Sequence, residues 1–182
     1  MADQKQTAFM EAYRPCHEPF VRYCSALAFG KMDVEDLMQD VLLAAYHQFE
    51  QIRKKDQMLH YLIRCARNRC ISHWRKKRFQ TELLEKYEDR MRAKGVSADT
   101  LLEIQWLYRC LDRLPNHQKE ALILFEISGF SMKEIAQMQS SSEGAVKTKI
   151  SRGRKKLQTL LDDQIPASRL SGIFQTIHSI AL

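Results

Sequence analysis

Glycine and proline are scarce in this sequence of 182 residues, with 6 glycines and 4 prolines. Architectures built from many short strands use both residues in their turns, so the scarcity favours long helices. Long apolar runs are also missing, since none approaches the roughly 20 residues that a helix needs to span a bilayer. The N-terminus has no apolar stretch like that of a signal peptide. We therefore expect neither a membrane span nor secretion.

The five cysteines are an odd number, and no two of them have C-x-x-C spacing. In a chain that is not exported, buried reduced thiols are the default. Cys16 and His17, with Cys24, could form part of a metal site, but their spacing fits no common zinc pattern. The six histidines are scattered, and no cluster or glycine-rich loop supports catalysis. We expect no metal, no cofactor and no enzymatic activity.

Acidic residues are outnumbered by basic ones, with 22 Asp and Glu against 29 Lys and Arg, so the formal net charge is +7. Apolar residues make up 45% of the chain, which is enough for buried cores. The basic excess suggests an anionic partner. By itself it does not distinguish a nucleic acid from a membrane surface.

Apolar residues recur at helical spacing through the first part of the chain. The clearest patterns predict an amphipathic helix over about 33–49, with Asp33 as its N-cap, and another over about 57–79. These helices differ in charge: 33–50 holds five acids and no Lys or Arg, whereas 58–80 holds seven Lys or Arg and no acid. This difference indicates two partners bound on two surfaces.

Segment 81–102 mixes charges of both signs, and Gly95 interrupts it. We interpret it as a linker between two domains, with a helix allowed in its first half; one continuous domain with a solvated helix here is the alternative. Beyond it, the pattern predicts helices over about 101–114, 118–127, 132–138 and 143–161. Since no segment has the pattern of a strand, we expect an all-α chain of two small helical domains.

Residues 128–157 have the pattern of a helix-turn-helix. Ser131 and Glu134 have capping-box spacing, and Ser142 is the expected N-cap of the second helix. Between 144 and 157 there are six Lys or Arg and no acid, which suits contacts to phosphates and base edges in the major groove. A solvated basic helix face is the alternative.

Three stretches in this order resemble the sigma-70 family of bacterial RNA polymerase sigma factors, specifically the small extracytoplasmic-function (ECF) group with only sigma domains two and four. Residues 33–46 resemble the family's core-polymerase-binding helix, and 61–75 resemble the helix that recognises the minus-ten element. Residues 111–122, continued by 129–136 and 143–154, resemble sigma domain four.

The chain departs from the family at several positions. Tyr61 and Ser72 stand where the family usually has Trp and Asp, respectively. Ala145 stands where the family often has Thr, which removes one possible DNA contact. The segment between 80 and 102 has no counterpart of a sigma domain three, as the small group implies.

The resemblance implies a division of the chain into four parts. These are sigma domain two over 1–80, a linker over 81–102, sigma domain four over 103–162, and an amphipathic C-terminal tail over 163–182.

The resemblance also implies three sets of binding residues. Asp36, Gln39 and Asp40 would face the clamp helices of the polymerase β′ subunit. The loop 51–56, with Asn68 below it, would take the flipped-out base of the melted minus-ten element. The minus-ten contacts would be made by Arg53, Lys54, Lys55, Arg64, Arg67, Asn68 and Arg75. The minus-thirty-five contacts would be made by Lys147, Thr148, Ser151 and Arg152, with Arg154 and Lys155 on phosphates.

These residues predict an alternative sigma factor that directs promoter-specific transcription initiation. Its partners would be core RNA polymerase, through the β′ clamp helices and the β flap, promoter DNA, and an anti-sigma factor, with no membrane insertion. The expected location is the cytoplasm, and the nucleoid when the protein is bound to polymerase. A helix-turn-helix repressor or activator that does not bind core polymerase is the alternative function.

The tail lies outside the resemblance. Leu170, Ile173, Phe174 and Ile177 fall at i, i+3, i+4 and i+7, which predicts a short amphipathic helix whose apolar face must be covered. One hypothesis is that this helix packs on domain four or domain two and adds stability. The other is that it bridges the two domains and holds the free protein compact.

Overall fold

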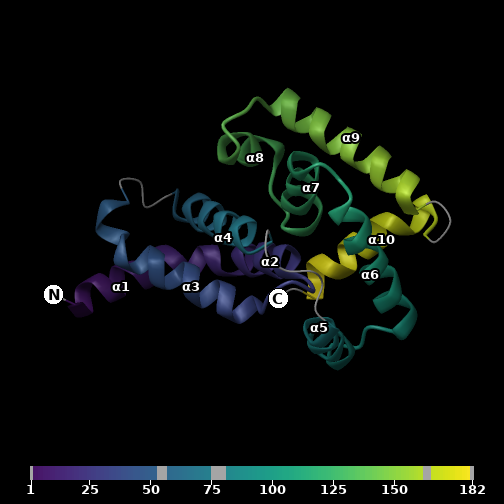
Figure 1. Ribbon diagram of the computed structural model, residues 1–182. Helices are drawn as coiled ribbons and strands as arrows, with labels where there is room; N and C mark the ends of the chain where they lie inside the picture. Colours follow the sequence, from purple (N-terminus) through teal and green to yellow (C-terminus); the bar gives the residue numbers. More distant parts are fainter. Residues whose placement is uncertain (1, 53–56, 75–80, 162–164, 181–182) are drawn as a thin grey trace. The chain divides into compact units, whose positions relative to one another are not determined.

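The computed structural model describes residues 2–52, 57–74, 81–161 and 165–180. All regular structure within these ranges is helical (Figure 1). The chain separates into two compact units, Met1–Leu83 and Leu84–Leu182. The predicted all-α class with two helical domains is therefore confirmed.

The first unit is built on three helices that pack against one another along their lengths (Figure 1). Its elements are α1 (Ala2–Tyr13), η1 (Arg14–Cys16), α2 (His17–Ala28), α3 (Val34–His47), η2 (Phe49–Gln51) and α4 (Met58–Trp74). Asp33 caps α3 as predicted, because its carboxylate accepts hydrogen bonds from the backbone N–H groups of Glu35 and Asp36 at 2.9 and 3.3 Å. Phe20, Tyr23 and Leu37 are completely buried between α2, α3 and α4.

Helix α1 supports the far end of α3. The ring of Phe9 packs edge-on against Tyr46, in the last turn of α3, and against Phe49 in η2, with centroid distances of 5.4 and 5.3 Å. Such aromatic pairs add to the stabilisation that burial itself provides. The contacts fix the end of α3 and the start of the loop that follows it.

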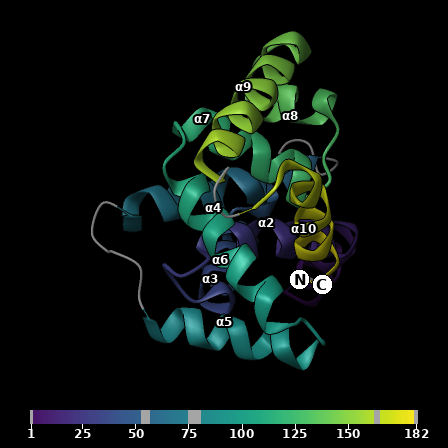
Figure 2. The same cartoon turned by 90° about the vertical axis from the view of Figure 1, so that its right-hand side faces the viewer.

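The second unit contains the helix-turn-helix. Its elements are α5 (Thr81–Ala93), most of which belongs to this unit, α6 (Ala98–Asp112), α7 (Asn116–Leu122), the π-helical turn η4 (Ile123–Ile127), α8 (Met132–Met138), α9 (Glu143–Leu161) and α10 (Ala167–Ile180). Figure 2 shows α9 with α7 and α8 on either side of it, and both helices contact α9. Lys119 of α7, only 7% exposed, forms an ion pair with Asp112 of α6.

Much of segment 81–102, interpreted from the sequence as a linker, is helical. Helix α5 extends to Ala93, and α6 begins after Ser97, whose hydroxyl accepts a hydrogen bond from the Thr100 N–H at 3.3 Å. Met91 of α5 is 1% exposed, and burial raises the pKa of Tyr87 to about 12. In the sequence, the mixed charges of the exposed face obscure the helical spacing of the few apolar residues that α5 buries.

The tail forms the predicted amphipathic helix, α10, and lies against α6 and η4 of the second unit. Its apolar side chains at positions 170, 173, 174 and 177 are buried. Packing on the second unit agrees with the first of the two hypotheses for the tail. The bridging hypothesis stays a prediction.

The contact between α9 and α7 depends on Gly153, in the middle of α9. A Cβ at this position would lie 3.1 Å from Cδ1 of Leu122 and 3.4 Å from Cβ of Gln118, both in α7. Because real side chains rarely come so close, α9 can approach α7 at this distance only with glycine.

We therefore expect Gly153→Ala to destabilise the second unit by about 1–2 kcal/mol, since overpacking outweighs the gain in helix propensity. Thermal unfolding followed by circular dichroism would measure the change. Gly172→Ala is the matched control, because its Cβ would meet no atom of the described residues within 4 Å. That variant should be neutral or more stable by up to about 1 kcal/mol. Equal effects of the two substitutions would contradict the close crossing.

Candidate functional site

The acidic candidates of the first unit share one exposed face of α3. Asp36, Gln39 and Asp40 are all exposed and follow the i, i+3, i+4 spacing of neighbours on a helix. Leu43 extends the same face and is 58% exposed, which is unusual for a leucine. Leu43 was not among the binding residues expected from the sequence, because the resemblance pointed only to polar residues of this helix.

Asp40 has a partner within its own unit. Its carboxylate accepts a hydrogen bond from the Arg69 guanidinium of α4 at 2.7 Å, and the two side chains are 56% and 46% exposed. Exposed ion pairs of this kind contribute little to stability, so a binding partner can displace one at small cost. The pair links the acidic helix to the basic one.

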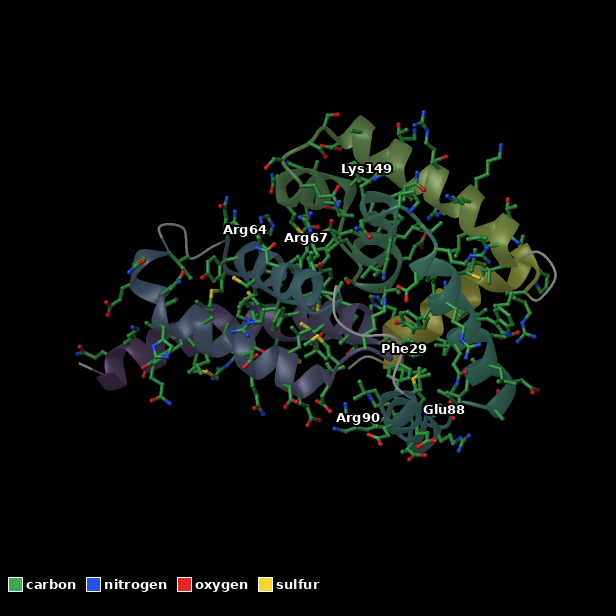
Figure 3. The ribbon with its side chains drawn as sticks, viewed as in Figure 1. Phe29, Arg64, Arg67, Glu88, Arg90 and Lys149 are labelled. Atoms are coloured by element: carbon green, nitrogen blue, oxygen red, sulfur yellow. The ribbon has the colours of Figure 1, made fainter. Side chains whose placement is uncertain are left out.

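The basic candidates of α4 are also exposed on one side. Arg64, Arg67 and Asn68 follow the same i, i+3, i+4 spacing, and Figure 3 shows the two arginines projecting from α4. Single-stranded nucleic acids bind to surfaces of this kind, where cations neutralise the phosphates. The remaining predicted minus-ten contacts, Arg53, Lys54, Lys55 and Arg75, lie outside the described residues.

A pocket of about 430 Å³ opens where η2 and α4 face each other. The described residues that line it are Gln48, Gln51, Ile52, Gln57, His60, Tyr61 and Arg64. The Tyr61 hydroxyl donates a hydrogen bond to Oε1 of Gln48 at 2.8 Å. Burial raises the pKa of Tyr61, and a side-chain hydrogen bond with Cys65 raises it further, so the Tyr61 hydroxyl stays protonated. Amides, an aromatic ring and a guanidinium together suit a planar, polar group such as a base.

The loop predicted to bind the flipped base overlaps part of the lining of this pocket. Gln51 and Ile52 belong to that loop, and both line the pocket. Asn68 was expected below the loop, but it is not among the described lining residues. Gln48 and His60 were missed, because no motif marks them and only the meeting of two elements brings them together.

The helix-turn-helix has the caps that its sequence predicts. The N–H of Glu134 donates to the Ser131 hydroxyl at 3.3 Å, and the N–H of Ser131 donates to the Glu134 carboxylate at 2.8 Å, which completes the capping box. The Ala145 N–H donates to the Ser142 hydroxyl at 3.1 Å at the start of α9. Both helices therefore begin at defined residues.

Helix α9 turns one side to the core and another to solvent. Val146, Ile150 and Gly153 are buried. The minus-thirty-five candidates at positions 147, 148, 151, 152, 154 and 155 are all exposed. The Thr148 hydroxyl donates to the Gly144 carbonyl oxygen at 2.9 Å within the helix, so it can still accept a hydrogen bond from a base but can donate one only by giving up or sharing that bond.

Two basic side chains of α9, Arg154 and Lys149, bind to other residues of the second unit. The Arg154 guanidinium forms an ion pair with Glu126 of η4 at 2.5 Å and lies 5.5 Å from the centroid of the Phe125 ring. Lys149, labelled in Figure 3, donates to Oε1 of Gln139 at 2.7 Å, across the turn between α8 and α9. These contacts fasten α9 to the elements on both sides of it.

The five cysteines, all among the described residues, are thiols and not disulfides, and four of them are buried. Burial raises the pKa values of the Cys16, Cys24 and Cys110 thiols, which keeps them protonated. Within the described ranges, no three His, Cys, Asp or Glu side chains are grouped so as to hold a metal ion. No helix there has both the length and the apolar content needed to cross a bilayer.

Comparison with known protein families gives two matches along this chain. Residues 6–80 match the model of sigma-70 region 2, and residues 104–157 match the model of sigma-70 region 4. Among curated proteins, the ECF RNA polymerase sigma factor EcfG of Rhodopseudomonas palustris is 32% identical over 146 residues, covering 79% of this chain and 80% of the relative. The sigma factor SigM of Mycobacterium tuberculosis is 28% identical over 155 residues, covering 85% and 77%.

Two solved structures have a similar fold. CnrH, in complex with the cytosolic domain of CnrY, superposes with a TM-score of 0.65 and 24% identity, covering 90% of this chain and 96% of CnrH. The sigma factor RpoE of Bartonella quintana, in complex with the anti-sigma factor NepR, superposes with a TM-score of 0.60 and 24% identity, covering 87% and 99%.

Proposed function

Because this chain belongs to the sigma-70 family of RNA polymerase sigma factors, within the ECF group, we propose how its two units divide the recognition of polymerase and promoter. The protein is an alternative sigma factor that binds core RNA polymerase and directs promoter-specific transcription initiation. A regulator that does not bind polymerase is not favoured, since such a protein needs no sigma region 2. The observation that carries the proposal is the juxtaposition of an acidic face on α3 and a basic face on α4 within one unit.

In this proposal, domain two over 1–80 binds core polymerase and the minus-ten element, and domain four over 103–162 binds the minus-thirty-five element and the β flap. Segment 81–102 remains the proposed linker, although it is largely helical and most of it belongs to the second unit. Asp36 and Gln39 contact the β′ clamp helices, and the exposed Leu43 adds apolar contact area on the same face. Asp40 joins this interface by exchanging Arg69 for a cation of the polymerase.

The pocket between η2 and α4 receives the flipped base of the minus-ten element. Extruding a base costs a few kcal/mol in lost stacking and pairing, which the pocket must offset. Tyr61 can stack on the base, while the amides of Gln48 and Gln57 can bond to its edge. Arg64, Arg67 and Asn68 then hold the strand, together with the predicted contacts Arg53, Lys54, Lys55 and Arg75.

Helix α9 enters the major groove of the minus-thirty-five element. Lys147, Thr148, Ser151 and Arg152 face the base edges, and Lys155 contacts a phosphate. Arg154 can contact a phosphate only by leaving Glu126 or by sharing its guanidinium with both. Arg154 should therefore contribute less than Lys155 to the free energy of DNA binding.

We also propose an anti-sigma factor as a partner, on the grounds that the two similar structures are complexes, one with the anti-sigma factor NepR and one with the cytosolic domain of CnrY. The names of the relatives give no catalytic activity, and we propose that the protein acts through binding alone. It works with RNA polymerase in the cytoplasm, and on the nucleoid when the complex is bound to a promoter.

Asp36→Lys should lower the affinity for core polymerase at least about tenfold, because it replaces an attraction at the interface with a repulsion. Fluorescence anisotropy with labelled full-length protein and core enzyme would measure it. Glu11→Lys makes the same charge change on an exposed position of α1 and should leave the affinity unchanged. Undiminished binding of folded Asp36→Lys protein would place the polymerase interface elsewhere.

Arg152→Ala should weaken binding to the minus-thirty-five element by roughly 1–3 kcal/mol if Arg152 makes a bidentate base contact. The promoter is first defined by sequencing the transcripts made with core polymerase, and affinities are then compared for intact and scrambled elements. The control Lys155→Ala should weaken binding to both DNAs alike and reduce the salt dependence. An equal loss on both DNAs for Arg152→Ala would make Arg152 a phosphate contact instead.

A further inference from the structure

The tail helix α10 lies outside both stretches that match the sigma-70 models, which cover 6–80 and 104–157. Even so, it is an integrated part of the second unit. Its apolar side packs on η4 and on α6, as the crossing of α10 and α6 in Figure 1 illustrates. Its buried side chains are Leu170, Ile173, Phe174 and Ile177. Burial of four large apolar groups accounts for attachment but does not explain the polar contacts at both ends of the helix.

The polar contact nearest the helix-turn-helix involves His178. Its Nδ1 lies 2.8 Å from the carbonyl oxygen of Ile127, the last residue of η4. Because a carbonyl only accepts, Nδ1 carries the proton and donates. The carbonyls in the last turn of a helix lack partners within it, so His178 supplies a donor that η4 itself does not provide. The contact is partly buried, where a lost hydrogen bond costs more than on the surface.

The imidazole ring also packs against the turn that leads into α8. Gly129 has φ of +80°, and a Cβ on it would lie 3.0 Å from Cε1 of His178. Two backbone hydrogen bonds also join the turn to η4. The N–H of Ser128 donates to the Ile123 carbonyl oxygen at 2.9 Å, and the N–H of Phe130 donates to the Leu124 carbonyl oxygen at 3.0 Å. The turn is thus fixed between η4 and the tail.

The tail is tied to the start of the second unit at two further points. Arg169, in its first turn, forms an ion pair with Glu103 of α6 at 3.1 Å. At its end, Nζ of Lys94 donates to the Ile180 carbonyl at 2.5 Å. The first turn of α10 is therefore tied to α6, and its last turn is tied both to the α5–α6 loop and to the end of η4.

Helix α9 is fixed at two places, by α7 and by α8, and this turn lies between those two helices in the chain. Its middle is fixed to α7 through Gly153 and Leu122, and its N-terminal half is fixed to α8, where Lys149 bonds Gln139. The position of α8 in turn follows from the turn Ser128–Phe130, because α8 begins at the very next residues. A shift in this turn would therefore displace the start of α8 and, through the bond between Lys149 and Gln139, the N-terminal half of α9.

We propose that α10 is a brace for promoter recognition and that His178 is a positioning residue, which fixes the turn Ser128–Phe130 and thereby the orientation of α8 and α9. The inference rests on the proposed role of α9 at the minus-thirty-five element. Base contacts demand closer alignment than phosphate contacts, so the brace should affect sequence discrimination more than overall DNA affinity. A tail that only adds stability would change neither quantity for folded molecules.

The test compares full-length holoenzymes on two duplexes, one with the minus-thirty-five element of the mapped promoter and one with that element scrambled. The measured quantity is the ratio of the two affinities, well below the melting temperature and normalised to folded protein. His178→Ala should reduce the ratio roughly three- to tenfold, the range that corresponds to one hydrogen bond. His178→Asn, which keeps a donor near the position of Nδ1, should restore most of it.

Ser179→Ala is the matched control, because its hydroxyl donates to the Thr176 carbonyl of its own helix, at 2.9 Å. The ratio for this variant should equal that of the wild type. If His178→Ala does not fold, His178→Phe replaces it, since it keeps a ring against Gly129 and removes the donor. The same loss is then expected.

The outcomes separate the brace from the function on which it rests. A wild-type ratio above one, with an undiminished ratio for folded His178→Ala or His178→Phe protein, overturns the brace alone. A wild-type ratio of one refutes the role of α9 at this element, and the brace falls with it. A lower melting temperature with an unchanged ratio also overturns the brace, because it shows that the tail contributes only stability.

Discussion

The close contact between α9 and α7 is the constraint on which promoter recognition by this protein depends. Gly153 lets the helices approach until Leu122 fills the space that a side chain would take. Buried residues follow at three- and four-residue intervals on both sides of it, which fixes the rotation of α9 about its axis. Once that rotation is fixed, Lys147, Arg152 and Lys155 can only face away from the core. A cationic surface of defined orientation is thus a consequence of apolar packing.

In the first unit, the binding surfaces are defined by the separation of acidic and basic residues onto two helices, whereas in the second unit the binding surface is defined by apolar packing. The acidic face of α3 and the basic face of α4 belong to helices that pack side by side, and Asp40–Arg69 is an ion pair that joins them. Exposed pairs of this kind are weak, so a charged partner can compete for the residues that form them. The acidic face attracts a cationic partner and the basic face attracts an anionic one. The electric field of each face also raises the rate at which its partner is first encountered.

The helices, caps and charged faces could be predicted from the sequence because they depend on local spacing: Asp33, Ser131 with Glu134, and Ser142 cap the helices that their positions predict. Contacts between distant residues could not be predicted in this way. Glu126 takes up Arg154, which the sequence assigned to a phosphate, and Gln48 meets Tyr61 across the pocket. Helix α5 was obscured because charges surround the few apolar residues that it buries. The surface that the tail covers could not be predicted from the sequence either, because amphipathicity predicts that a helix buries one face but not which surface that face contacts.

The most direct test of the account is run-off transcription by purified core polymerase on the DNA upstream of the gene for this protein, with and without the protein. The account predicts a discrete transcript that appears only when the protein is present and is lost when either promoter element is scrambled. That dependence on both elements follows from two separate DNA-binding units on one chain. No gain over core polymerase alone, or a transcript indifferent to both elements, would contradict it.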